Sequence, residues 1–192
     1  MTTLALIRHG ITEWNEINKL QGHQNIPLSE KGKEQVLALA NRLVGEKWDI
    51  IYSSDLQRAK ETANILAEKM GLQVMIDKRL RERYFGRLEG TIEIDRMAQW
   101  GKYWRELHHG IEENEKIELR VAQFFYDIIH PLNEKKIIVI SHGITINKML
   151  KIILKDYNEI EIHNTSVSIL KKNDHEWFLH LFNCTEHLKK MM

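Results

Sequence analysis

Short apolar runs alternate along the chain with longer stretches in which apolar residues recur every three or four positions. Each run has the length of a β-strand. Four of them occupy residues 4–7, 49–52, 73–76 and 137–140, and two more occupy residues 166–170 and 177–182. The last pair flanks the polar segment KKNDHE, which predicts a hairpin turn between two strands.

The stretches between these runs have helical periodicity. Ser29 and the pair Ser54-Asp55 are residue types that cap helix N-termini, and each precedes a helical face. The positions on the four predicted faces are Val36, Leu39, Ala40 and Leu43; Ala59, Thr62, Ala63, Leu66 and Met70; Val121, Phe124, Phe125 and Ile128; and Ile146, Met149, Leu150 and Ile153. Strands that alternate with helices predict an α/β fold, with a mainly parallel sheet covered on both faces.

Residues that can carry chemistry adjoin the predicted strands. The motif RHG at residues 8–10 follows the first run, and SHG at residues 141–143 repeats the His-Gly pair after the fourth. Arg58 falls in the first turn of the helix after the second run, and Glu82 lies in a glycine-bounded loop after the third. Because ligands of such sheets bind beyond the carboxyl ends of the strands, we expect these residues to surround one pocket.

A pocket that contains Arg8, His9, Arg58, Glu82 and His142 suits phosphoryl transfer. A neutral imidazole can attack phosphorus, and two guanidiniums can form forked bonds to the phosphoryl oxygens. A second, protonated imidazole can donate to the same oxygens. A carboxyl group can protonate the leaving oxygen and later take a proton from water. Each motif alone is typical of ordinary structural or surface residues, so the prediction depends on their joint occurrence.

Composition argues against several other classes of function. The 192 residues are 43% hydrophobic and 29% charged, as in a soluble globular protein. The net charge of +1 argues against a nucleic acid or a membrane surface as a partner. Cys184 is the only cysteine, which excludes an internal disulfide, and we find neither a signal-type leader nor a membrane-length apolar run. We therefore expect a cytoplasmic protein.

A metal centre is one alternative, because ten histidines are many. However, the sequence has no H-E-x-x-H motif, and His108 and His109 are neighbours that would face different ways on a helix. We therefore expect neither a metal ion nor a cofactor. The other alternative is a phosphate-binding module without catalysis. The presence of both a candidate nucleophile and a candidate acid argues against it.

The motifs together closely resemble those of the histidine phosphatase superfamily, the phosphoglycerate-mutase-like proteins, and look most like its small bacterial broad-specificity phosphatases. In chain order they are RHGITEWN, LQGHQNIPLSEKG, SSDLQRAKETA, RERYFGRLEG, ISHGIT and NTSVSIL. The resemblance implies a single domain over residues 1–192, built as a three-layer α/β/α sandwich with a mixed, mostly parallel sheet. It also implies hydrolysis of a small phosphorylated metabolite through a phosphohistidine, with the oligomeric state left open.

By the same resemblance, His9 is the phosphorylated nucleophile and Glu82 is the proton donor. The other catalytic and phosphate-binding residues that it implies are Arg8, Asn15, Gln21, Gly22, Arg58, His142 and Gly143. The chain departs from the family pattern at Asn25, where an aspartate is common, and around residues 111–113, where the family has GES.

The substrate-facing insert of the family corresponds to residues 91–116, which we expect to form a short helical segment. Glycolytic mutases of the family resemble longer chains with an arginine-rich insert, whereas this segment has only Arg96 and Arg105. The pattern therefore favours a phosphatase, with a cofactor-dependent phosphoglycerate mutase as the alternative. Three aromatic residues at helical spacing are typical of packing, and lining the cleft is their alternative role: Trp100, Tyr103 and Trp104.

Overall fold

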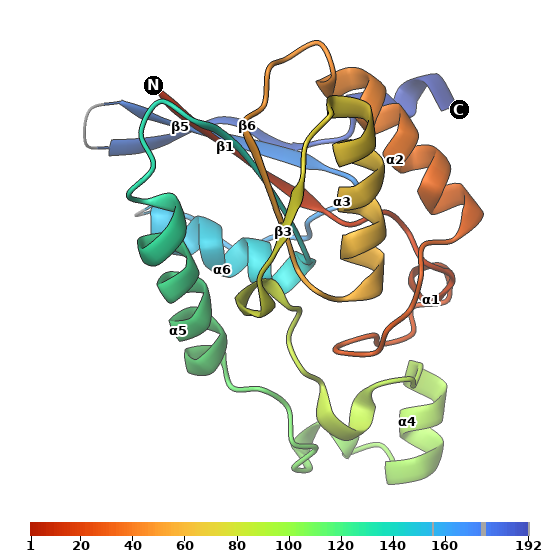
Figure 1. Ribbon diagram of the computed structural model, residues 1–192. Coiled ribbons are helices and arrows are strands. Elements are labelled where there is room, and N and C mark those ends of the chain that lie inside the picture. Colours follow the sequence, from red (N-terminus) through yellow and green to blue (C-terminus); the bar gives the residue numbers. More distant parts are fainter. Residues whose placement is uncertain (155, 174–175, 192) are drawn as a thin grey trace.

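The sheet of the protein is mixed and has its parallel strands on one side. The structure is a computed structural model that describes residues 1–154, 156–173 and 176–191. The six strands lie in the order β3-β2-β4-β1-β5-β6 (Figure 1). They are β1 (Thr2–Arg8), β2 (Ile50–Ser53), β3 (Val74–Ile76), β4 (Lys136–Ser141), β5 (Val167–Asn173) and β6 (Glu176–Cys184).

Pairing within the sheet follows the predicted pattern. Strands β1 to β4 are parallel, and β5 is antiparallel to both β1 and β6. All six predicted runs are therefore strands. The hairpin turn predicted within KKNDHE includes residues 174 and 175, which lie outside the described residues.

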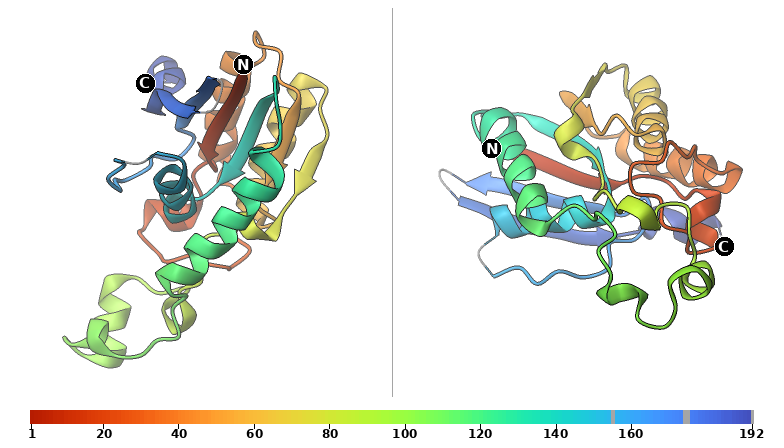
Figure 2. Two further views of the ribbon diagram at one scale, coloured as in Figure 1. Left: turned by 90° about the vertical axis from the view of Figure 1, so that its left-hand side faces the viewer. Right: turned by 90° about the horizontal axis from the view of Figure 1, so that it is seen from below.

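The helices are α1 (Glu13–Glu16), α2 (Glu30–Leu43), α3 (Gln57–Met70), α4 (Glu93–Trp100), α5 (Asn114–Phe124) and α6 (Gly143–Ile153). Helices α2 and α3 cover one face of the sheet, and α5 and α6 cover the other (Figures 1 and 2). Successive residues of a strand point to opposite faces, so Leu4 and Leu6 pack with the core under α5 and α6. Ala5 and Ile7 pack with the core under α2 and α3. The three-layer α/β/α sandwich with a mostly parallel sheet is thus confirmed.

Two helix starts illustrate where local pattern decides and where it does not. Ser29 caps α2, because its Oγ accepts a hydrogen bond from the N–H of Gly32 at 3.1 Å. The cap predicted at Ser54-Asp55 is wrong, since α3 begins at Gln57 and has no local side-chain cap. The N–H of Gln57 instead donates to Oδ1 of Asn25 at 3.0 Å. The unusual Asn25 therefore supports the helix that carries the pocket arginine.

Helix α4 and the 3-10 turn Trp104–Glu106 lie away from the sheet (Figure 2). Gly101 ends α4 with a φ of 76°, which is readily adopted only by glycine. The helix predicted to carry His108 and His109 is therefore absent, and these residues follow the 3-10 turn in an irregular segment. We call residues 93–106, from the start of α4 to the end of this turn, the α4 segment.

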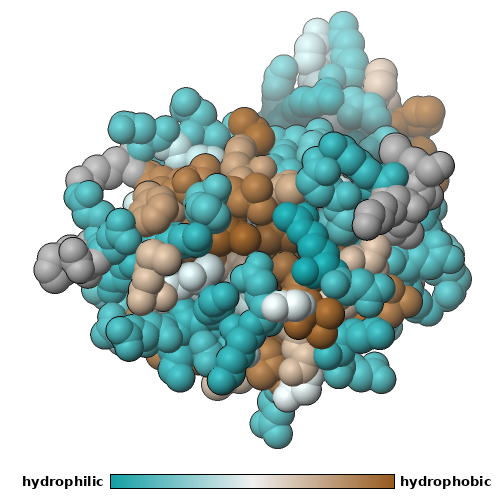
Figure 3. All heavy atoms as spheres, turned by 90° about the horizontal axis from the view of Figure 1, so that it is seen from above, coloured by the Kyte–Doolittle hydropathy of each residue, from teal (hydrophilic) through white to brown (hydrophobic). Residues whose placement is uncertain are grey.

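At the end of the molecule opposite to the α4 segment, a hydrophobic band crosses a mainly hydrophilic surface (Figure 3).

Within the described residues, no helix is long and apolar enough to span a membrane.

Candidate active site

The two His-Gly motifs meet because their strands are neighbours. Strands β1 and β4 pair in parallel with Arg8 opposite Ser141, so the residues that follow both strands leave the sheet at the same edge. The ring centroids of His9 and His142 are 5.1 Å apart. Gly143 begins α6 directly after His142. The structure therefore brings the two motifs together, as expected from the sequence.

His9 is buried and has one ring nitrogen directed to the pocket. Its Nδ1 donates to the carbonyl of Gly10 at 2.7 Å, which leaves the lone pair on Nε2. Arg58 donates from Nε to this Nε2 at 3.2 Å. Burial, followed by the charges of Arg58 and Arg8, holds the pKa of His9 well below its usual value of 6.5. At neutral pH the imidazole is therefore uncharged and nucleophilic.

Arg8 and Arg58 place two cations beside this imidazole. Arg58 is 1% exposed and donates to the carbonyls of Gly22 and Gln24 at 2.8 and 2.9 Å. Burial lowers the pKa of Arg58 to about 10 and also lowers that of Arg8, while nearby Glu82 acts in the opposite direction on both. Both guanidiniums stay charged at neutral pH.

Neither of these guanidiniums forms an ion pair in the described part of the chain, unlike those of Arg79, Arg81 and Arg120. The Nε of Arg8 is buried without any hydrogen-bond partner. Because a buried cation is costly unless it is paired, this arrangement favours an anionic ligand.

His142 is fully buried behind His9 and is oriented by Ser54. The hydroxyl of Ser54 accepts from the N–H of Leu56 at 3.3 Å, and it can donate to Nε2 of His142 at 2.9 Å. The ring proton then lies on Nδ1, which is buried without a partner. Burial, followed by Arg58, His9 and Arg8, lowers the pKa of His142 well below 6.5. These surroundings favour an uncharged imidazole at neutral pH rather than the protonated donor expected from the sequence, and its Nδ1–H remains a donor.

The half-buried carboxylate of Glu82 lies against the start of α6. It accepts hydrogen bonds from the N–H groups of Arg83 and Ile144 at 2.9 and 3.3 Å and from the hydroxyl of Thr145 at 3.4 Å. A Cβ atom on Gly143 would lie 3.9 Å from Nε of Arg8 and 4.0 Å from Oε2 of Glu82. The carboxylate, the guanidinium and the helix start therefore meet at one point.

A cavity of about 180 Å³ lies among these groups, but His142 and Gly143 do not line it. It is lined by Arg8, His9, Asn15, Lys19, Leu20, Gln21, Gly22, Arg58, Glu82 and Phe85. The Oδ1 of Asn15 accepts from the N–H and the hydroxyl of Thr12, which leaves its Nδ2 for a ligand. The Oε1 of Gln21 is buried and has no partner. A larger groove of about 420 Å³ beside Trp177 has no such convergence of donors.

The three aromatic residues of the α4 segment do not line this cavity. Trp104 is buried, and the guanidiniums of Arg96 and Arg105 lie 4.8 and 4.3 Å from its ring centroid. Trp100 packs against His109, whereas Tyr103 is exposed. They are packing or surface residues, as the spacing favoured.

Sequence reasoning missed the residues that hold the pocket loops. The carboxylate of Glu89 accepts from the N–H groups of His23 and Phe85 at 2.8 and 3.1 Å, and a Cβ on Gly22 would lie only 1.9 Å from its Oε1. Gly22, with a φ of 50°, thus lets Glu89 fix the loop whose carbonyls bind Arg58. No local pattern distinguished Glu89 from a surface charge.

The motif NTS explains the shape of the first strand end. Asn164 donates from Nδ2 to the carbonyl of His9 at 3.0 Å, and the N–H of Thr165 donates to the carbonyl of Arg8 at 3.0 Å. Thr165 is buried with a φ of 57°, an uncommon conformation for a β-branched residue. These contacts lock the backbone that carries the imidazole and the guanidinium.

Within the described residues, no three His, Cys, Asp or Glu side chains are grouped so that they could hold a metal ion. The donors of the pocket are nitrogen cations and amides, which suit an anion.

Comparison with known proteins decides the family. The histidine phosphatase superfamily (branch 1) matches residues 4–185. The chain belongs to this superfamily. The chain is 31% identical to phosphoglycerate mutase-like protein 4 of Arabidopsis thaliana over 97% of this chain and 87% of that protein.

Solved structures of histidine phosphatases resemble the whole chain. A mycobacterial glucosyl-3-phosphoglycerate phosphatase in complex with VO3 has a TM-score of 0.80 and 30% identity, covering 95% of this chain and 98% of that one. A mutant phosphoserine phosphatase from Entamoeba histolytica in complex with phosphoserine also has a TM-score of 0.80 and 30% identity, covering 98% and 100%. The histidine phosphatase fold and family are therefore confirmed, with both phosphatases and a mutase-like protein among the relatives.

Proposed function

We propose that this histidine phosphatase hydrolyses small phosphomonoesters through a covalent phosphohistidine at His9. The observation that carries the proposal is an uncharged, buried imidazole that accepts a hydrogen bond from buried Arg58 and feels the charge of half-buried Arg8, with neither guanidinium in an ion pair within the described residues. The glucosyl-3-phosphoglycerate phosphatase and the phosphoserine phosphatase among the similar proteins support this substrate class. We also propose that residues 1–192 form one domain, with residues 91–116 as a substrate-facing insert.

In the first step, Nε2 of His9 attacks phosphorus and the bond to the leaving oxygen breaks. The phosphoryl oxygens accept hydrogen bonds from Arg8, Arg58 and Nδ1 of His142, and the amides of Asn15 and Gln21 with the backbone at Gly22 and Gly143 complete the cradle. Nε of Arg58 then transfers its bond from the imidazole to a phosphoryl oxygen. The positive charge thus stabilises the transition state where negative charge is spread.

Glu82 supplies the proton for this step. The carboxyl group protonates the leaving oxygen, and the resulting carboxylate then takes a proton from water as the water attacks phosphohistidine. The second step releases phosphate and restores His9.

The leaving group provides the test. An alkyl phosphate releases an alkoxide, which is a poor leaving group and needs the proton. The p-nitrophenolate released from p-nitrophenyl phosphate is a stable anion and needs it less. We expect Glu82→Gln to lose much more kcat/KM toward an alkyl phosphate than toward p-nitrophenyl phosphate, and to accumulate an acid-labile phosphohistidine with the aryl substrate. Equal losses for both substrates would remove Glu82 from this role, and Glu13 would be the next carboxylate to test.

A panel of phosphorylated metabolites would identify the substrate, with phosphate release and phosphoglycerate isomerisation measured in parallel. Isomerisation faster than release would favour the mutase alternative, which the name of one relative supports.

We expect turnover to persist with a chelator present, because Arg8 and Arg58 supply the positive charge. Competitive inhibition by vanadate, much tighter than by phosphate, would distinguish an enzyme from a phosphate-binding module, because vanadate adopts the five-coordinate geometry of the transition state.

A further inference from the structure

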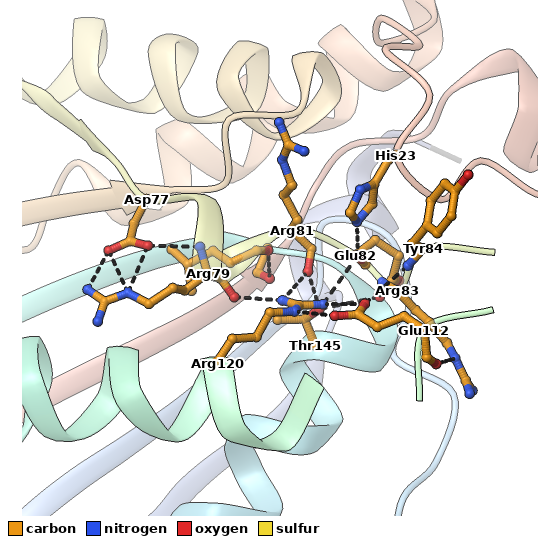
Figure 4. A network of polar contacts seen from close by, with 12 residues as sticks. His23, Asp77, Arg79, Arg81, Glu82, Arg83, Tyr84, Glu112, Arg120 and Thr145 are labelled. Atoms are coloured by element: carbon orange, nitrogen blue, oxygen red, sulfur yellow. Dashed lines mark hydrogen bonds and ion pairs between the residues drawn. The ribbon is translucent and has the colours of Figure 1, made fainter. Parts of the chain in front are cut away.

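Arg120 lies outside the pocket, yet its guanidinium contacts the chain segment that carries Glu82. From α5 it donates to the backbone carbonyls of Arg79 at 2.6 Å, Arg81 at 2.7 Å and Glu82 at 3.3 Å (Figure 4). The carbonyl of Glu82 also accepts from Nε2 of His23 at 2.7 Å. The carbonyl of Arg81 accepts in addition from the hydroxyl of Thr145 at 2.7 Å. One largely buried cation thus contacts three carbonyls within four residues.

Glu112 holds this guanidinium from the opposite side. Its carboxylate accepts from Nε and Nη2 of Arg120 at 2.9 and 3.1 Å, which is the forked geometry of a strong pair. Burial raises the pKa of Glu112, but the hydrogen bonds and charge of Arg120, together with the N–H of Tyr84 and the nearby His23, lower it by more, so the pKa lies below its usual value. Glu112 therefore stays ionised and keeps the guanidinium oriented.

Glu112 also joins the two chain segments that lead to and from the α4 segment. Its carboxylate accepts from the N–H of Tyr84 at 3.2 Å, and its carbonyl accepts from Nε of Arg83 at 2.8 Å. The N–H of Glu112 donates to the carbonyl of Tyr84 at 2.8 Å. The departure from GES around residues 111–113 thus retains a carboxylate that reaches the residues next to Glu82 (Figure 4).

We propose that Arg120, oriented by Glu112, is a positioning residue for proton transfer: it fixes the backbone of Glu82 so that the carboxyl group reaches the leaving oxygen. The inference rests on the proposed role of Glu82 as the acid. Arg120 does not line the cavity, and its hydrogen bonds go to Glu112 and to the backbone of residues 79–82 rather than to His9, Arg8 or Arg58. Its loss should therefore affect proton delivery selectively.

The test compares β-glycerol phosphate with p-nitrophenyl phosphate in the full-length enzyme. In Arg120→Lys the charge remains but the fork and most carbonyl bonds are lost, and a displacement of this kind costs roughly 10–10²-fold in the step that needs the displaced group. We expect that loss in kcat/KM for the alkyl ester and only a few-fold loss for the aryl ester. Glu112→Gln should change the ratio of the two values in the same direction but less, because Arg120 keeps its carbonyl contacts.

Arg79→Lys is the matched control. Arg79 lies on the same segment, but its guanidinium pairs with Asp77 and Asp127 at 2.7 and 2.9 Å and points away from Glu82 (Figure 4). We expect its ratio of alkyl to aryl kcat/KM to equal that of the unsubstituted enzyme. Melting temperatures of all variants report whether a loss reflects unfolding, which would affect both substrates equally.

The double variant Arg120→Lys with Glu82→Gln completes a double-mutant cycle, which tests whether the two residues act together. If Arg120 acts through Glu82, adding Arg120→Lys to Glu82→Gln should cause no further selective loss for the alkyl ester. Equal losses for both esters in folded Arg120→Lys, or multiplicative selective losses in the double variant, would overturn the inference while leaving the role of Glu82 intact. Absence of selectivity in Glu82→Gln itself would instead overturn the proposed acid, and the inference with it.

Discussion

The phosphate pocket and the α4 segment are held by different means. In the pocket, His9 and Arg58 are 3% and 1% exposed, and both lie within a few residues of the carboxyl end of a buried strand. In the α4 segment, Ile94 and Tyr103 are 73% and 59% exposed, and the local packing centres on Trp104. Trp104 belongs to neither of the two apolar cores that flank the sheet.

This difference indicates that the pocket must be rigid for catalysis, whereas the α4 segment can tolerate sequence changes. Transition-state stabilisation requires donors that are already oriented and desolvated, which the buried sheet edge provides. A segment outside the core can change its sequence with little effect on that edge. The two regions meet at residues 81–84 and Glu112, where Arg120 links them. Substitutions on either side of this link should therefore have different consequences.

The largest effect is expected for His9→Ala, which removes the proposed nucleophile. Loss of a covalent nucleophile typically reduces kcat by about 10⁶-fold. The measurement is steady-state turnover of p-nitrophenyl phosphate together with rapid-quench assay of phosphoprotein. A variant that still formed phosphoprotein would place the nucleophile on another residue.

Comparison of Arg58→Ala with Arg96→Ala tests two buried arginines in different regions. Arg58 contacts the imidazole, so we expect its loss to reduce the chemical rate by about 10²–10³-fold. Arg96 packs on Trp104 and donates to the carbonyl of Thr91, so its loss should leave the aryl rate nearly unchanged. Similar rate losses in both variants, with folding intact, would contradict the separation of the two regions.

The free energy of unfolding should also respond differently to substitutions in the two regions. Phe124 of α5 is fully buried in the core, and Phe124→Ala should cost about 3–5 kcal/mol of unfolding free energy. Trp104→Ala removes a larger side chain but should cost less, because it loosens a segment outside both cores. Urea denaturation of the two variants measures the difference. A larger cost for Trp104→Ala would mean that the α4 segment folds cooperatively with the sheet.

The smallest effect concerns pH. Burial, and then Arg42, lowers the pKa of His187 to about 4 from the 6.5 of the unfolded chain. Between these values the unfolded chain binds a proton that the folded one does not, so the unfolding free energy decreases as the pH falls from 6.5.

The lowered pKa values of His9 and His142 act in the same direction. Urea midpoints at pH 7.5, 6.5 and 5.5 should decline less in His187→Gln, in which an amide replaces the contact to Thr165. Parallel declines in the two proteins would show that His187 does not contribute to the pH dependence.

Several structural features were predictable because they depend on local pattern. The six strands follow from short apolar runs, and the α2 cap follows from Ser29. The approach of His9 to His142 was predictable as well, because parallel strands bring the residues after them to one edge. The false cap at Ser54 shows the limit, since its hydroxyl bonds to His142, which lies 88 residues away in the chain.

The sequence by itself determined the fold class, the strand ends and the residue types of the pocket, because side-chain periodicity and strand termini are local properties. Only the tertiary structure decided which ring nitrogen of His9 faces Arg58, that burial lowers the pKa of His142, and that Glu89 and Arg120 bind the loops beside the pocket. These outcomes depend on burial and on hydrogen bonds between distant segments. The bond from Arg120 to the carbonyl of Glu82 spans 38 residues, and no local pattern encodes such a contact.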